Sequence, residues 1–386
     1  MRRHIFIALS LLALTIGVAS PALGHQASSR SFVPDGDQRP VVLSASLDPP
    51  QRHNDLLEAD LSIDASDRDG IVAFEYRWVG PTVGAVFATG TDTPTVSYRS
   101  TDPDSYQTLE VRAIDGDGLP SEWFSAWSGT TPSVPNLVVA GDSIASGYTK
   151  QWFTSGGTCT DADASYGSTI HNEVASSLPS QWAPTYRNVA WAGAGVHAMT
   201  TGGVDSCGTE HGSQIEAVQA ATDDRTWNIV VVTAGINSTN WSNVVINLTK
   251  NTAFSLTERG DKGWCEVGVG ERWNISDRAA GITTAVRGIS SALRTETNAD
   301  VYWTSYYGIT DTKLAPGWTP IGSECDEEMS GALDRLHSAI RTGLHGSVTW
   351  VEVDDARIPT QGWAGWPHPN TDGHRYIGER VAAAIT

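Results

Sequence analysis

The sequence is poor in basic residues: it has 25 Lys and Arg against 44 Asp and Glu among 386 residues, a formal net charge of −19. Such a charge repels phosphate backbones and anionic lipid headgroups, so nucleic acid is not expected as a partner. No apolar run reaches the length of about 20 residues that a membrane-spanning helix needs. The composition therefore argues against a nucleic-acid-binding protein and against a membrane span.

The longest apolar run lies at the amino end, over positions 5–18, between two arginines and a stretch of small residues. This order is typical of a secretory signal peptide, which we predict over residues 1–27 with cleavage near Ala22 to Ala27. We therefore expect a secreted, extracellular protein.

Cysteine is also scarce, with four residues and no C-x-x-C pair. This spacing argues against zinc, and no metal is expected. An even number of cysteines in an exported chain favours disulfides, for which three connectivities are possible. Pairing in sequence order, Cys159–Cys207 with Cys265–Cys325, closes the shorter loops.

The segment 40–132 has the pattern of short strands separated by turns. "IVAFEYRWVG" alternates partly between apolar and polar residues, "TPTVSYRS" and "TLEVRAID" follow, and Asp-Gly, Gly-Pro and Asp-Pro pairs separate the runs. This pattern predicts a small all-β sandwich domain. In style the segment resembles the PKD and fibronectin type III (Ig-like) modules of extracellular proteins.

A group of aspartates lies near the turns of this module: Asp64, Asp67, Asp69, Asp115 and Asp117. Their carboxylates could gather as oxygen ligands for calcium. The alternative is that they only form turns, which Asp and Gly favour without an ion. The ligand spacing of an EF-hand is absent, which favours the turn interpretation.

We interpret "TTPSVP" as a linker. After it, over residues 134–386, the pattern of apolar residues changes from short alternating strands to continuous apolar runs separated by helical patterns. Mostly continuous apolar runs predict buried strands at 136–141, 227–235, 299–306 and 347–353. Helical patterns lie between and after them, at 166–178, 212–221, 277–295, 327–344 and 372–385. Strands alternating with helices predict a parallel sheet in a three-layer α/β domain, where sites form at the carboxyl ends of strands.

Residues suited to acyl transfer follow these predicted strands. Ser143 comes directly after a strand in "LVVAGDSIASGY", where a hydroxyl can stand above the sheet edge among backbone N–H groups. Gly193 in "RNVAWAGAG" is expected at the end of a second strand, and Asn237 beyond a third. His368 stands just ahead of the last predicted helix. The residues predict a serine nucleophile, a histidine base and donors for an oxyanion.

In order, these motifs resemble those of the SGNH hydrolases of the GDSL esterase/lipase superfamily, over about residues 136–386. The matching blocks are "GDSIASGY", "NVAWAGA", Gly235-x-Asn237 and "HPN". The resemblance implies a flavodoxin-like domain and a carboxylic-ester hydrolase without a cofactor. In it Ser143 attacks, His368 takes the proton, and the oxyanion is held by Ser143, Gly193 and Asn237. It also implies disulfides between cysteines that are neighbours in sequence.

The sequence departs from this family at two positions. Ser238 replaces the Asp that commonly follows the asparagine, away from the chemistry. Gly365 stands where the family's acid is usual, three residues before His368, and no acidic residue lies between Arg357 and His368. We predict a Ser–His dyad in which a main-chain carbonyl near Gly365 orients the histidine. The alternative acid is Asp354 or Asp355.

Other residues near His368 have a structural or a binding interpretation. His374 is expected to pack or cap, because one base suffices for the chemistry. Trp363 and Trp366 either line an acyl or sugar pocket or pack under the final loop.

The expected substrate is an ester of a lipid, a short acyl chain or a carbohydrate. The β module suggests attachment to a cell wall or polysaccharide surface, which favours carbohydrate-linked esters. The alternatives are a non-enzymatic carbohydrate-binding or adhesion protein with a relic hydrolase domain, and an acyltransferase with the same Ser–His chemistry.

Overall fold

The structure is a computed structural model. It describes residues 39–47, 58–68, 70–80, 86–89, 95–97, 103–150, 157–222, 226–239, 241, 274–307, 323–353, 358–359 and 368–386. The predicted signal peptide, residues 1–27, lies outside these ranges, as do Trp363 and Trp366. Within them, no helix combines the length and the apolar character that crossing a bilayer requires.

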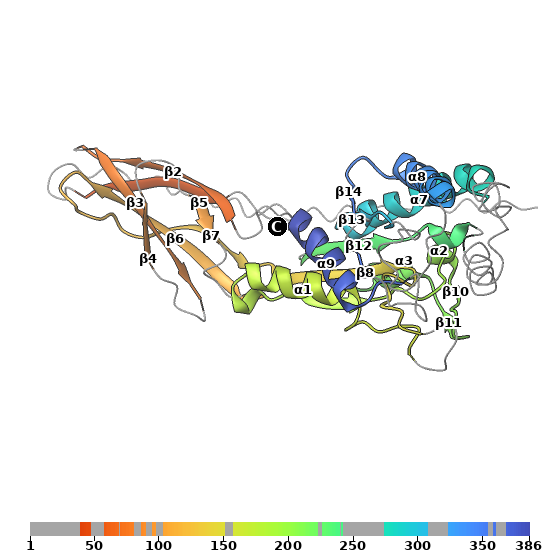
Figure 1. The fold of residues 1–386 in the computed structure, drawn as a ribbon. Coiled ribbons are helices and arrows are strands. Elements are labelled where there is room, and N and C mark those ends of the chain that lie inside the picture. Colours follow the sequence, from red (N-terminus) through yellow and green to blue (C-terminus); the bar gives the residue numbers. More distant parts are fainter. Residues whose placement is uncertain are drawn as a thin grey trace, which may run out of the picture.

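The amino-terminal part consists of two small antiparallel sheets (Figure 1). One has the order β1 (Val41–Leu47), β2 (Glu58–Ser66), β5 (Thr95–Ser97), and the other β4 (Val86–Thr89), β3 (Ile71–Val79), β6 (Tyr106–Asp115), β7 (Phe124–Thr130). Burial alternates along β3 and β6, as expected for strands with one face in a core. Leu61, Trp78 and Leu109 from three strands share that core, which confirms the predicted small all-β domain.

The aspartates of this module are placed differently from one another. Asp64 lies within β2. The Oδ1 of Asp115 accepts the backbone N–H of Asp117 at 2.9 Å and of Leu119 at 2.8 Å. The Asp115 side chain therefore stabilises its own turn, in agreement with the turn interpretation. Asp69 lies outside the described residues.

The carboxyl-terminal part is built on a five-stranded parallel sheet with the order β14 (Thr349–Val351), β13 (Asp300–Thr304), β12 (Thr226–Thr233), β8 (Ser133–Gly141), β9 (Thr185–Asn188). Numbered along the chain this is the flavodoxin-like order 2-1-3-4-5, which confirms the predicted fold class. Every residue of β12 is buried, as its continuous apolar run predicts. The strand order reverses between β8 and β12, where such sheets place ligands.

Helices cover both faces of this sheet. α1 (Tyr166–Ser177) and α9 (Thr371–Ile385) pack side by side on one face (Figure 1). α7 (Ile275–Thr297) and α8 (Ser323–Gly343) pack together on the other, with the short α3 (Gln214–Gln219) beside α7. The five helices lie where the 3.6-residue period predicts them. The side chain of Ser165 caps α1 and that of Asn370 caps α9.

The segment predicted as a linker is mostly strand, so that prediction is wrong. Only Thr131 and Pro132 lie between β7 and β8, and Thr131 is fully buried. Trp182, in the 3₁₀ helix η3 (Ser180–Trp182) after α1, is buried in the core of the β module. The two parts are therefore joined by a two-residue connection and by a shared apolar contact.

Candidate active site

The turn that carries Ser143 begins where β8 ends. Gly141 has φ +132°, and a Cβ there would collide with the main chain of Thr233 on β12, so the position requires glycine. The N–H of Ser146 donates to the carbonyl of Asp142 at 2.9 Å, and that of Tyr148 to the carbonyl of Ser143 at 3.0 Å. These bonds hold the serine at the carboxyl edge of the sheet.

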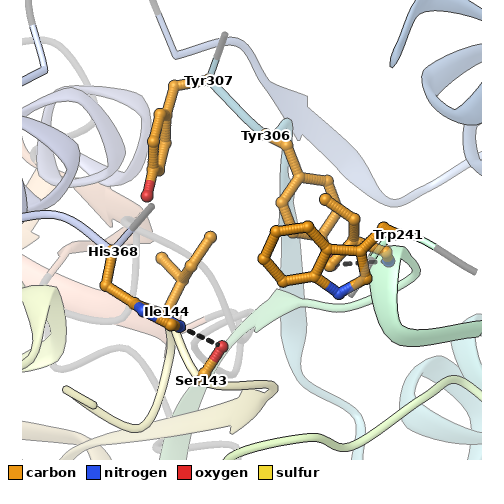
Figure 2. Close-up of a pocket in the computed structure, with 7 residues that line it drawn as sticks. Ser143, Ile144, Trp241, Tyr306, Tyr307 and His368 are labelled. Carbon is orange, nitrogen blue, oxygen red and sulfur yellow. Dashed lines mark hydrogen bonds between the residues drawn. The ribbon is translucent and has the colours of Figure 1, made fainter. Parts of the chain in front are cut away.

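The structure brings Ser143 and His368 together, as the sequence predicts. The Nε2 of His368 lies 2.9 Å from the Oγ of Ser143 (Figure 2), although the residues are 225 positions apart. The exposed fractions are 7% for Ser143 and 4% for His368, so bulk water hardly reaches their hydrogen bond. The ring of Tyr148 packs against the imidazole with 4.5 Å between centroids. The pair has the distance that proton transfer from hydroxyl to imidazole requires.

Gly193 lies in the turn after β9. It is exposed and has φ +92°, a conformation that favours glycine. The sequence predicts it at the end of a strand, but β9 already stops at Asn188. The strand is shorter because the N–H of Ala190 turns back to the Oδ1 of Asn188 at 3.0 Å. The glycine thus belongs to the loop that follows the strand.

Asn237 lies in the 3₁₀ helix η4 (Ile236–Ser238), which follows β12. Its Oδ1 accepts the indole N–H of Trp241 at 2.7 Å, and its Nδ2 donates to the carbonyl of Ala194 at 3.3 Å. Because an indole nitrogen only donates, the first bond fixes which end of the amide carries the N–H groups. The Nδ2 has a second hydrogen, which is suited to an oxyanion.

The loops that carry Gly193 and Asn237 are tied to one another. Besides the bond from Asn237 to Ala194, the N–H of Val196 donates to the Oγ of Ser238 at 2.8 Å. Ser238, where the sequence departs from the family pattern, therefore holds the two predicted oxyanion loops in register.

A buried pair that the sequence motifs do not reveal, Asp142 and Tyr306, lies beneath the proposed nucleophile. The Oδ2 of Asp142 accepts the Tyr306 hydroxyl at 2.5 Å, and its Oδ1 accepts the N–H of Ile144 at 3.0 Å. Burial raises the pKa of Asp142 to about 7, against the lowering effect of these hydrogen bonds. Tyr306 lies just after β13 (Asp300–Thr304), at the carboxyl edge of the sheet, and this position is the one signal in the sequence that it could belong to the site. No local pattern in the sequence indicates that its partner is Asp142.

His374 packs in the interior, as predicted. It is 3% exposed, and neither ring nitrogen has a hydrogen-bond partner in the part of the chain that the structure describes. Burial, with a smaller contribution from nearby His368, lowers its pKa to about 3. It is therefore neutral at physiological pH. The candidates for orienting His368, which are Gly365, Asp354 and Asp355, lie outside the described residues.

A disulfide joins Cys159 and Cys207, as predicted, with their Cα atoms 6.0 Å apart. Cys159 packs with Tyr148 and Ala192, which are neighbours of the histidine and of the glycine loop. Asp205 lies close to both sulfurs, but cysteines bonded to each other offer no thiolate to a metal. Cys265 lies outside the described residues, so Cys265–Cys325 stays a prediction.

The chain is similar to solved lipases and esterases. A phospholipase A1 from Streptomyces albidoflavus NA297 is 16% identical, with a TM-score of 0.45, and the match covers 66% of this chain and 100% of that one. For an extracellular lipase from Streptomyces rimosus the values are 15%, 0.44, 66% and 100%. For Est24, a carbohydrate acetylesterase from Sinorhizobium meliloti, they are 13%, 0.34, 65% and 98%.

No model of a protein family matches the chain, and no curated protein does. At these identities and TM-scores the likenesses do not establish an activity. We therefore take the fold from the chain's own sheet order, and the function from the geometry of its own site.

Proposed function

We propose that the protein is a secreted carboxylic-ester hydrolase that acts through an acyl-Ser143 intermediate. The observation that carries this proposal is the 2.9 Å contact between Ser143 Oγ and His368 Nε2, in a buried site at the carboxyl edge of the sheet. A serine hydroxyl is a weak nucleophile, and an adjacent imidazole activates it by taking its proton.

In the proposed reaction, Ser143 Oγ attacks the ester carbonyl while its proton moves to His368 Nε2. The carbonyl oxygen becomes an oxyanion, for which the N–H groups of Ser143 and Gly193 and the Nδ2 of Asn237 are the donors. Collapse breaks the bond to the alcohol, which leaves with the proton from His368. Water then attacks the acyl-serine with His368 as base, which releases the acid and restores Ser143.

We further propose that His368 works as a Ser–His dyad, oriented by a main-chain carbonyl near Gly365. A neutral hydrogen bond contributes about 1 kcal/mol and a charged one about 2 kcal/mol. A carbonyl in place of a carboxylate therefore costs less than about tenfold in rate. It still fixes the imidazole tautomer, whose loss costs about 10⁴-fold in a serine protease.

The signal-like amino end supports the proposed export, and the Cys159–Cys207 disulfide fits an oxidising compartment. The β module fits a role in attachment to a cell wall or polysaccharide. On that basis we propose a carbohydrate-linked ester ahead of a lipid.

The test is turnover of p-nitrophenyl acetate by the wild type, Ser143→Ala and His368→Ala. We expect kcat to fall by at least about a thousandfold in both variants, as in serine hydrolases that lose a triad member. Ser176→Ala, on the exposed side of α1, is the matched control and should keep wild-type turnover.

A second readout identifies the nucleophile directly. A fluorophosphonate probe should label the wild type at Ser143 and leave Ser143→Ala unlabelled, as read by peptide mass spectrometry. If the folded wild type neither cleaves any ester of a broad panel nor reacts with the probe, the hydrolase proposal fails and a binding protein is the better description.

A further inference from the structure

A small pocket opens beside the Ser143–His368 pair (Figure 2). Besides these two residues, its walls are Ile144, Ile236, Trp241, Tyr306 and Tyr307. Figure 2 shows Trp241 and Tyr306 across the pocket from His368, with Tyr307 above His368. The pocket adjoins the Oγ that would carry the acyl group, so it is the natural place for that group's carbon chain.

The pocket walls are already closed in the free protein. Their exposed fractions are 9% for Ile144, 6% for Trp241, and 2% or less for Ile236, Tyr306 and Tyr307. A long acyl chain gains binding energy when its own carbons and the apolar pocket walls are both removed from water. These walls expose little apolar surface. The first carbons of an acyl chain therefore gain binding energy from them, and the later carbons gain little.

The volume of the pocket sets the same limit. Its enclosed part is about 10 Å³, which is room for about one water molecule. It can therefore hold only the first carbons of an acyl group next to Ser143 Oγ, and the rest of a long chain would lie outside the enclosed part.

We infer that the site selects short acyl groups, from acetyl to butyryl, and that Ile144 and Ile236 are among the residues that set this limit. The inference rests on the proposed ester hydrolysis and names its acyl specificity. The acetyl and short-chain esters of carbohydrates belong to this class, and the long-chain esters of membrane and storage lipids do not.

The experiment compares kcat/KM for p-nitrophenyl acetate, butyrate and octanoate, each below its micelle concentration. A pocket that took the whole chain would raise kcat/KM about fourfold per buried CH₂, or about 250-fold from butyrate to octanoate. We expect a fall of at least tenfold instead. Ser143-dependent turnover that increases through octanoate would overturn the inference and leave the proposed function standing. Absence of turnover with all three esters would count against the proposed function itself.

Variants of the pocket provide the second arm. Ile236→Ala and Ile144→Ala each widen the wall, and each should raise the ratio of octanoate to acetate kcat/KM at least tenfold. The matched control is Ile289→Ala, which empties the same volume at a buried position of α7. It should destabilise the fold without moving the ratio. An unchanged ratio in both folded pocket variants would contradict the assignment of these two residues.

Discussion

The hydroxyl of Tyr306 lies 2.5 Å from the Oδ2 of Asp142 and accepts the backbone N–H of Ile236 at 3.1 Å. The hydroxyl thus connects the turn that carries Ser143 with the short helix that carries Asn237. With Asp142 ionised, the hydrogen bonds run in one direction, from Ile236 N–H through the tyrosine to the carboxylate. The proposed nucleophile and the proposed oxyanion donor are therefore positioned by one buried phenol.

Replacing Tyr306 with Phe should lower kcat for p-nitrophenyl acetate by about tenfold to a hundredfold, with a much smaller change in KM. The ring stays, but a buried carboxyl and a buried N–H lose their partner, which costs about 1 to 3 kcal/mol for each. The hydrogen bond lowers the pKa of Asp142, so its loss should raise that pKa above about 7. Any inflection of kcat that follows Asp142 should move to higher pH. Tyr302→Phe, in β13, is the control, and equal kcat in both variants would refute this role of Tyr306.

Replacing His374 with Leu should change the pH dependence of stability. The pKa of His374 is about 3 in the folded chain and about 6.5 when unfolded. Between these values the unfolded chain binds a proton that the folded chain does not, so the free energy of unfolding falls as pH falls from 6.5 toward 3. At pH 5 this loss is about 2 kcal/mol relative to pH 8.

The leucine variant should lose this part of the pH dependence. It should also gain about 1 kcal/mol or more at pH 8, since two unpartnered ring nitrogens disappear from the interior. Urea unfolding at pH 5 and pH 8 measures both effects. A smaller slope should remain, because burial also lowers the pKa of His337, to about 4. An identical difference between the two pH values in wild type and variant would contradict the prediction.

Breaking the Cys159–Cys207 disulfide should reduce both stability and activity. The bond closes a separation of 48 residues, for which the chain-entropy model gives about 4 kcal/mol. Cys159 packs on Tyr148, which contacts the imidazole, and the N–H of Ser206 donates to Ala192 beside Gly193. We expect the Cys159→Ser/Cys207→Ser variant to have a lower Tm and a lower kcat. Assays at a temperature where the variant is folded separate the two effects. Wild-type kcat in the folded variant would exclude the catalytic part.

The dyad is tested by replacing Asp354 and Asp355 separately with Ala. We expect kcat to fall by less than about tenfold in either variant, because a carbonyl orients His368 in the proposed site. A loss of more than about a hundredfold, or roughly 2.7 kcal/mol, in a folded variant would identify that aspartate as the acid.

Local patterns were enough to predict most of the fold. The sequence predicts the strands and helices of the α/β part because apolar residues repeat with different periods in the two kinds of element. The predicted bounds differ from those in the structure by a few residues. The linker prediction is wrong because a segment rich in Pro, Ser and Thr can still form strand. Pro135 lies where the pairing of β8 with β12 shifts register, a position that tolerates proline.

Local sequence patterns also predict part of the candidate site. Ser143, Gly193, Asn237 and His368 stand in motifs whose residues are contiguous, so the sequence reveals them. The partnership of Asp142 with Tyr306 links positions 164 residues apart and leaves no local mark. The walls of the pocket likewise come from several loops, whose approach depends on the strand order.

The indole of Trp182 belongs to one half of the molecule and is buried in the other. Cutting the chain between Thr131 and Pro132 would expose that ring to water on the α/β half and would leave a cavity in the core of the β module. An exchange of modules between proteins would have to carry the region around Trp182 along with the strands. The connection between the two parts is only two residues long. If the β module binds a surface, as proposed above, it would hold that surface at a fixed distance from Ser143, and the proposed hydrolase would act on esters at that distance.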